Sequence, residues 1–272
     1  MPQSFRQTEI LALAKKEGRV LVEDLRARFD VTAQTIRRDL AELCDTGKLE
    51  RVYGGALLPS GVANIGYEDR RMLYSEEKDR IARLCACSIP DDASLFLNIG
   101  TSTEAVAREL LGHKNLMVVT NNMNVANILM ANPSCEVVVA GGVVRRSDGA
   151  LVGDITADMV QQFKVDVAVI GASALDNDGD LLDFDFREVR VTQAVVRNAR
   201  RTFLVSDHSK FSRSAPVRIA SLEDIDTFFT DRDPPKPVQQ LCRRWKTRVE
   251  VAPDRSKAQP AAAGPGAQRT EV

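Results

Sequence analysis

The sequence predicts an α/β protein of two domains, an N-terminal winged helix-turn-helix followed by a larger domain with a mainly parallel sheet. Three observations predict this fold. Residues 5–58 contain three short helical patterns and then two short strands around a Gly-Gly pair. From residue 67, apolar strands alternate with helical stretches, as they do in parallel α/β sheets. The chain has 272 residues, 44% of them hydrophobic, which suffices for two domains.

The N-terminal elements follow from helix stop signals and turn residues. Gly18 ends a first helix, Asp30 and Val31 form the turn before the third helix, and Gly47 ends that helix. A Gly-Gly pair between two short strands is typical of a β-hairpin. The expected elements are a helix over residues 5–17, a strand at Val20–Val22, helices over Glu23–Phe29 and Thr32–Thr46, and strands at Leu49–Tyr53 and Ala56–Leu58. The domain so defined spans residues 1–58.

The third helix has the pattern of a DNA recognition helix. Thr32 can cap its N-terminus through the hydroxyl, and Ala33, Ile36 and Leu40 share one apolar face. The other faces keep side chains that bond base edges and phosphates in a major groove. The candidate DNA contacts are Thr32, Gln34, Thr35, Arg37 and Arg38 on this helix, and Arg51, Tyr53, Gly54 and Gly55 in the hairpin wing. Residues 1–58 hold ten Lys and Arg against nine Asp and Glu, so DNA affinity depends on where each charge is placed.

The rest of the chain predicts a linker, an α/β domain and a tail. Residues 59–66 are rich in turn-forming residues and are the expected linker, and residues 67–252 form the α/β domain. The expected strands are Ser94–Ile99, Leu116–Thr120, Glu136–Ala140, Val165–Ile170, Arg201–Ser206 and Thr227–Thr230. The expected helices are Ser75–Ala86, Thr103–Leu111, Asn124–Met130, Ile155–Phe163, Arg187–Ala199 and Pro235–Arg244. Several strands are almost continuously apolar, which predicts burial on both faces. The composition of residues 253–272 predicts a disordered tail.

Polar residues gather where the predicted strands end, and open α/β sheets bind ligands at that edge. Asn98-Ile-Gly-Thr-Ser-Thr103 follows a strand and opens a helix. Its hydroxyl and N–H groups favour a phosphate, although an ordinary capped turn uses the same residue types. Asp207 is suited to accept a ligand hydroxyl, and Lys210 to bind a phosphate. The candidate effector residues from this pattern are Asn98, Gly100, Thr101, Ser102, Thr103, Thr120, Asn121, Asn122, Gly141, Gly142, Asp154, Asp207 and Lys210.

Other patterns point to little further chemistry. Asp183 and Asp185 could bind a metal or solvate a loop, and we favour the loop, so no metal site is expected. The histidines, His113 and His208, have no neighbours in the sequence that complete a catalytic triad. No apolar run reaches the ~20 residues of a membrane span. The start of the chain lacks the pattern of a signal peptide, so we expect a cytoplasmic protein.

These motifs resemble the DeoR family of bacterial transcriptional regulators. The resemblance rests on Arg6, Ile10, Thr32–Leu40 and Arg51–Ala56, and it extends to about residue 252. It implies a DNA-binding repressor whose second domain is ribose-5-phosphate-isomerase-like and binds a phosphorylated sugar or polyol. A single winged helix covers too few base pairs for genomic specificity. We therefore expect a homo-oligomer, a dimer or a tetramer, on double-stranded operator DNA.

Within this family, two segments are most similar to regulators of glycerol metabolism genes, which implies glycerol 3-phosphate as the effector. The segments are Val118–Met130 and Leu182–Arg190, and the second contains Glu188, a further candidate effector residue. Asn98 stands where relatives usually have Asp, and Thr192 stands where many have Lys. Because of these differences, another small phosphorylated sugar or polyol stays open as the effector.

The competing hypothesis is an enzyme, because related sensor folds catalyse sugar-phosphate isomerisation. An isomerase needs a carboxylate base that faces its substrate, and Asp154, Glu188 and Asp207 are the candidates. Residues 1–58 have no evident use in such an enzyme. We therefore expect a regulator with no catalytic residues and no cofactor, whose small-molecule ligand is an effector.

Overall fold

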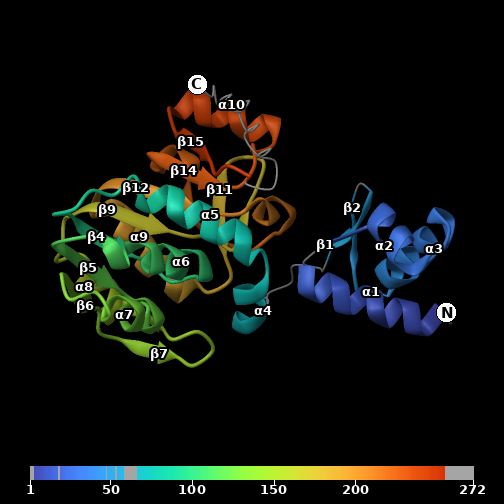
Figure 1. The fold of residues 1–272 in the computed structure, drawn as a ribbon, viewed down its shortest axis with the longest axis horizontal. Coiled ribbons are helices and arrows are strands. Elements are labelled where there is room, and N and C mark those ends of the chain that lie inside the picture. The colour runs from blue at the N-terminus through green and yellow to red at the C-terminus, as the bar shows by residue number, and fades with distance from the viewer. Residues whose placement is uncertain (1–2, 18, 47, 53, 58–65, 255–272) are drawn as a thin grey trace, which may run out of the picture.

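The computed structural model describes residues 3–17, 19–46, 48–52, 54–57 and 66–254, and Figure 1 shows the order of their helices and strands. Tyr53, residues 59–65 of the expected linker and residues 255–272 of the expected tail lie outside the described residues. In the part of the chain that is described, no helix combines the length and the apolar composition needed to cross a membrane.

The N-terminal part has the predicted order of three helices and a hairpin. Its elements are α1 (Gln3–Glu17), β1 (Arg19–Leu21), α2 (Val22–Phe29), α3 (Ala33–Asp45), β2 (Glu50–Val52) and β3 (Gly55–Leu57). Val22, expected to end the first strand, instead begins α2 and is buried. The strand β1 joins the hairpin in an antiparallel sheet of order β1-β3-β2, so the wing is a three-stranded sheet.

The two glycines of the wing have different physical roles. Gly54 adopts a φ of +78° in the turn, with no heavy atom within 4 Å of the place where a Cβ would lie. Gly55 lies in β3 against β1, where a Cβ would come within 2.0 Å of the carbonyl oxygen of Val20. Gly54 therefore allows the turn, and Gly55 allows the two strands to pair.

A buried ion pair joins α1 to the recognition helix inside an apolar core. Ile36 and Leu40 of α3 are buried against Ile10 of α1, as the spacing of the helix predicts. Asp39 lies on the same helix and is only 1% exposed, and its carboxylate accepts two hydrogen bonds from the Arg6 guanidinium, one of them at 3.1 Å. These hydrogen bonds raise the pKa of Arg6. Because both charges are buried, each needs the other to stay in place.

The second domain is built on a parallel sheet of seven strands in the order β15-β14-β12-β9-β4-β5-β6. The six predicted strands are present, and β15 adds a seventh that the sequence patterns did not indicate. The strands are β4 (Ser94–Leu97), β5 (Leu116–Thr120), β6 (Cys135–Val139), β9 (Val165–Ile170), β12 (Ala199–Val205), β14 (Thr227–Thr230) and β15 (Arg248–Val251). The strand β6 lies at an outer edge of the sheet and is partly exposed.

Helices cover both faces of this sheet (Figure 1). The helices are α4 (Tyr67–Met72), α5 (Ser75–Ala86), α6 (Thr101–Glu109), α7 (Met123–Leu129), α8 (Asp154–Val160), α9 (Phe186–Arg197) and α10 (Lys236–Trp245). Leu95 and Leu97 of β4 pack in a core with α5, α6 and α7, whereas Phe96 packs in a second core with α8, α9 and α10. This alternation follows from the two-residue period of a strand.

Two small antiparallel structures stand beside the main sheet at the carboxyl ends of its strands. The strands β7 (Val143–Arg145) and β8 (Ala150–Val152) form a hairpin. The strands β10 (Ala174–Leu175), β11 (Asp180–Asp183) and β13 (Val217–Ser221) form a second antiparallel sheet. The sequence patterns predicted neither. Both supply charged residues to the site described below.

Replacing Asp39 with Asn is expected to destabilise the N-terminal domain by roughly 3–5 kcal/mol, because the Arg6 guanidinium would stay buried without its counter-charge. Hydrogen exchange of α3 peptides in the full chain measures this loss. The control is Arg38→Gln, which removes an exposed contact with Glu42 at 3.4 Å and should cost no more than about 0.5 kcal/mol. The account of the ion pair is wrong if α3 exchanges no faster in the Asp39 variant than in the control.

Candidate functional site

The predicted DNA-binding residues lie on the exposed side of α3 and in the wing. Thr32 caps α3, since its hydroxyl accepts a hydrogen bond from the Thr35 N–H at 3.2 Å. Gln34, Arg37 and Arg38 are exposed. Arg37 also lines a hollow of about 290 Å³ with Arg51, Gly54 and Gly55, so helix and wing form one surface. Gly55 is buried, and its lack of a side chain serves the pairing of β3 with β1.

In the second domain, the N-terminus of α6 is open toward the carboxyl edge of the sheet. Gly100 precedes the helix with a φ of +134°, and no side chain caps this end among the described residues. The hydroxyl of Thr103 donates to the Gly100 carbonyl at 2.8 Å, which leaves the backbone N–H groups of the first turn for a ligand. An uncapped helix N-terminus with its positive dipole end favours an anion.

Cationic side chains gather beside this helix end, around the buried carboxylate of Asp207. Burial and the charge of Arg213 lower the pKa of Lys210 well below its usual value. Burial lowers the pKa of Lys78 to about 8 and also lowers the pKa of Arg213. The charge of Asp207 favours the charged form of Lys210, and among the described residues Nη1 of Arg213 is buried without a hydrogen-bond partner. A bound anion would stabilise the charged forms of all three groups.

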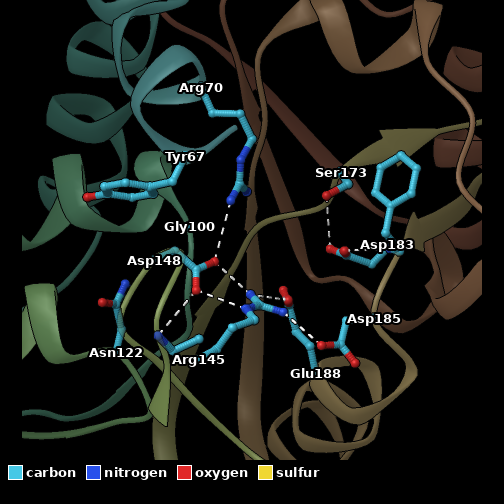
Figure 2. Close-up of polar contacts among 12 residues, drawn as sticks. Tyr67, Arg70, Gly100, Asn122, Arg145, Asp148, Ser173, Asp183, Asp185 and Glu188 are labelled. Atoms are coloured by element: carbon cyan, nitrogen blue, oxygen red, sulfur yellow. Dashed lines mark hydrogen bonds and ion pairs between the residues drawn. The ribbon is translucent and has the colours of Figure 1, made fainter. Parts of the chain in front are cut away.

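Carboxylates form the opposite side of the site, around Arg145 of β7 (Figure 2). The Arg145 guanidinium forms ion pairs with Asp148 at 2.6 Å, Asp185 at 3.0 Å and Glu188 at 2.7 Å. Burial, and then the charge of Asp183, raises the pKa of Glu188 to about 8. The Glu188 carboxyl therefore takes up a proton more readily than an ordinary glutamate, although its Oε2 accepts a hydrogen bond from Arg145 at 2.7 Å.

Two adjoining cavities lie between the cationic and the acidic groups. The smaller has a volume of about 30 Å³ and includes Gly100, Thr101, Ser102 and Lys210 in its lining. The larger has a volume of about 500 Å³ and is lined by residues of α4, the β7–β8 hairpin and the start of α9. The two linings share four residues, Arg70, Asp148, Asp183 and Glu188.

The predicted effector residues divide between this site and structural positions. Gly100, Thr101, Ser102, Glu188 and Lys210 line the small cavity, and Asp207 lies among the cations beside it. The remaining candidates of the β5 loop line neither cavity and hold the loop together. The Thr120 hydroxyl donates to Leu97 O at 2.7 Å, the Asn121 amide donates to Leu151 O at 3.2 Å, and Asn122 caps α7 by accepting from Asn124 N at 2.8 Å.

Three further candidates lie outside both cavities. Gly142 packs against α8, where a Cβ would come within 2.0 Å of the Thr156 hydroxyl, and Gly141 accepts a hydrogen bond from the same hydroxyl at 2.7 Å. The Asp154 side chain is 70% exposed and pairs with Arg190 at 2.9 Å. The expectation that these three residues surround the ligand therefore does not match their positions.

The two positions that depart from the family pattern are hydrogen-bonded to each other. The amide of Asn98 donates to the Thr192 hydroxyl at 2.8 Å, and both side chains are buried. Neither residue lines the cavities. The two residues that differ from the family pattern therefore form one uncharged hydrogen bond between the end of β4 and α9.

Several residues of the site were not found from the sequence. Asp183, which we expected to solvate a loop, is only 6% exposed and accepts a hydrogen bond from the Ser173 hydroxyl at 3.1 Å. Lys78 could have been found from the sequence, because a lysine on the apolar face of a helix indicates a buried charge. It shares that face of α5 with Ile81 and Cys85. The remaining members of the site that were missed are Arg70, Arg145, Asp148, Arg213 and Ser173. Among the described residues, no cluster of His, Cys, Asp and Glu could hold a metal ion.

A winged helix-turn-helix joined to an α/β domain with a charged cavity is the architecture of a ligand-sensing transcription regulator. Residues 6–62 match the DeoR-like helix-turn-helix domain, and residues 74–232 match the DeoR C-terminal sensor domain. The chain belongs to the DeoR family of transcriptional repressors.

Two curated relatives match almost the whole chain. The glycerol-3-phosphate regulon repressor of Escherichia coli (strain K12) is 46% identical over 92% of this chain and 100% of its own length. The repressor of the same name from Haemophilus influenzae is 44% identical, over 92% of this chain and 97% of its own. Among solved structures, ribose 5-phosphate isomerase A from Neisseria gonorrhoeae is 14% identical with a TM-score of 0.37, over 53% of this chain and 55% of that one. That likeness is too distant to bear on activity.

Proposed function

We propose that this chain represses genes of glycerol and glycerol 3-phosphate metabolism and releases operator DNA when glycerol 3-phosphate binds the sensor domain. One structural observation supports the effector class above all: the N-terminus of α6, where no side-chain cap is found among the described residues, and the side chain of Lys210 line the same cavity. The names of the two curated relatives support the choice of effector within that class.

The phosphate group fits the cationic side of the site. Its oxygens would accept hydrogen bonds from the N–H groups of Thr101–Thr103, and its charge would lie between Lys210 and Arg70. A phosphomonoester carries a charge between −1.5 and −2 at neutral pH. This charge would stabilise the charged forms of Lys210 and Arg213, whose pKa values are lowered by burial.

The hydroxyl groups of the effector fit the acidic side. Asp183 and Glu188 line the same cavities as Arg70 and can accept hydrogen bonds from a polyol. The hydroxyl of Ser173 can donate or accept. A ligand with a phosphate at one end and hydroxyls along its length would satisfy both sides.

The helix-turn-helix would act as the DNA reader, within the domain boundaries expected from the sequence: residues 1–58, a linker over 59–66, a sensor over 67–252 and a tail over 253–272. We place α3 in the major groove, with Arg37 and Gln34 toward the bases and the wing toward the backbone. A homo-oligomer would present two such helices to a repeated site. We further propose that the protein works in the bacterial cytoplasm, as a transcriptional repressor must.

The site supports binding rather than catalysis. Of the candidate bases, Asp154 is exposed outside the cavities, and Asp207 caps a short helix by accepting from Ser209 N at 3.0 Å. Glu188 is ion-paired with Arg145. We therefore propose no enzymatic activity and no cofactor.

Replacing Arg37 with Ala is expected to weaken operator binding by roughly 5- to 150-fold, because one base or phosphate contact per subunit is lost. Fluorescence anisotropy with a labelled operator duplex measures the change. The control is Arg200→Ala, which removes an exposed arginine of β12 that pairs with Asp166 at 3.4 Å. Equal operator affinity of the Arg37 variant and the control would contradict the assignment of α3 as the recognition helix.

Glycerol 3-phosphate is expected to weaken operator binding by the wild-type chain, and Lys210→Met to abolish that response because the phosphate loses its ammonium partner. Operator titrations with and without the ligand measure both effects. Lys164→Met is the matched control, since Lys164 is exposed at the far end of β9. A wild-type chain that ignores glycerol 3-phosphate but responds to another sugar phosphate would contradict the proposed effector. A Lys210 variant that responds like the control would contradict the position of the phosphate.

A further inference from the structure

We propose that Tyr67 is the positioning residue through which the effector cavity controls the segment that leads to the helix-turn-helix, because it ties α4 to Glu104 in the first turn of α6. The inference rests on the proposed function, since it concerns how the two sites communicate. It assigns a role to a residue that neither the sequence patterns nor the proposed ligand contacts include.

Both ends of α4 are attached to the first turn of α6. At its start, the Tyr67 hydroxyl donates to Oε2 of Glu104 at 2.9 Å. At its last turn, the carbonyl oxygen of Arg70 accepts a hydrogen bond from the Thr101 hydroxyl at 3.4 Å and another from the buried Lys78 ammonium. The helix α4 is thus hydrogen-bonded to the first turn of α6, and the N–H groups of that turn face the small cavity.

The buried carboxylate of Glu104 fixes the position of the Tyr67 hydroxyl. Its carboxylate is 3% exposed and forms no ion pair within the described part of the chain. Three neutral donors hold it: the Tyr67 hydroxyl, the Asn122 amide at 3.3 Å and the Asn124 amide at 3.1 Å. The Asn124 amide also lies 3.0 Å from the Tyr67 oxygen. A buried carboxylate depends on every donor it has, so the Tyr67 hydroxyl is held in one place.

Entry of a phosphate would act on this arrangement through Arg70. The small cavity, at about 30 Å³, has room for roughly one or two water molecules and is too small for a phosphate group. Two of its walls are Arg70, on α4, and the first turn of α6. Arg70 is also held by Asp148 at 3.4 Å, and a phosphate would compete with that carboxylate. Competition for the Arg70 guanidinium can therefore shift α4 relative to the β7–β8 hairpin, to α6, or to both.

The position of α4 in the chain carries the shift onward. It begins at Tyr67, directly after the segment that connects the two domains. With the Tyr67–Glu104 bond in place, a change at the cavity moves both ends of α4 together. Without this bond, the last turn of α4 can follow Arg70 while its start stays where it was. The effector and operator DNA would then each still bind, but neither would change the affinity for the other.

The test is a thermodynamic cycle on the full chain with the variant Tyr67→Phe, which keeps the ring and removes the hydroxyl. Operator affinity is measured with and without saturating glycerol 3-phosphate, using a duplex that the wild-type chain selects from genomic fragments. We expect the ratio of the two affinities to fall by at least about fivefold toward one, while operator DNA alone binds as it does to the wild type. A role limited to structure would instead lower the melting temperature and both affinities together.

Glu104→Gln should reduce the ratio in the same direction, and Glu109→Gln is its matched control at the other end of α6, where the glutamate pairs with Arg83 at 3.7 Å. A wild-type ratio of one would overturn the proposed function and this inference together. A wild-type ratio well above one that Tyr67→Phe leaves unchanged would overturn the inference alone.

A second measurement uses the unmodified chain, so it remains decisive if the Tyr67 variant fails to fold. Hydrogen exchange over residues 66–73 is compared with and without glycerol 3-phosphate. We expect protection in this segment to change when the ligand binds. Unchanged exchange there, with altered exchange at the start of α6, would overturn the inference.

Discussion

At the carboxyl ends of its strands, the sensor domain gathers three buried cationic side chains, Lys78, Lys210 and Arg213, around the carboxylate of Asp207. Burial lowers the pKa values of Lys78, Lys210 and Arg213, yet Asp207 is the one carboxylate whose charge opposes all three shifts. The open N-terminus of α6 adds a partial positive charge to the same cavity. Burial disfavours the charged forms of these three side chains, so this arrangement favours the state in which an anion is present. An effector with a phosphate group supplies that anion.

This constraint explains how one small cavity can influence a distant surface. Arg70 is drawn toward Asp148 on one side and toward the cavity on the other, and its helix begins where the connection between the domains ends. The free energy of phosphate binding can therefore act on the position of α4. Its effect on DNA is limited to the difference in affinity between the two positions, and operator DNA must weaken effector binding by the same factor.

The sequence predicted the features that depend on local spacing. The period of Ile36 and Leu40, the cap at Thr32 and the apolar strands gave the helix-turn-helix and the parallel sheet. It also placed Gly100–Ser102 and Lys210 at the site, because parallel strands end at one edge. Pairs distant in sequence were not predictable, since nothing near Arg145 or Arg70 distinguishes them from solvated arginines. The pairing of Asp39 with Arg6 could not be predicted for the same reason. A charge on the apolar face of a helix indicates only that some partner is present.

Proton uptake on effector binding is the most direct measurement of the central claim that the phosphate stabilises the charged forms of these buried cations. Calorimetric titrations of glycerol 3-phosphate at about pH 8, near the pKa of Lys78, are compared in buffers with different heats of ionisation. The phosphate itself is fully ionised there, because its second pKa is about 6. An anion beside Lys78 and Lys210 raises both pKa values, so the account predicts that the protein takes up protons as the ligand binds. Binding without proton uptake would contradict it.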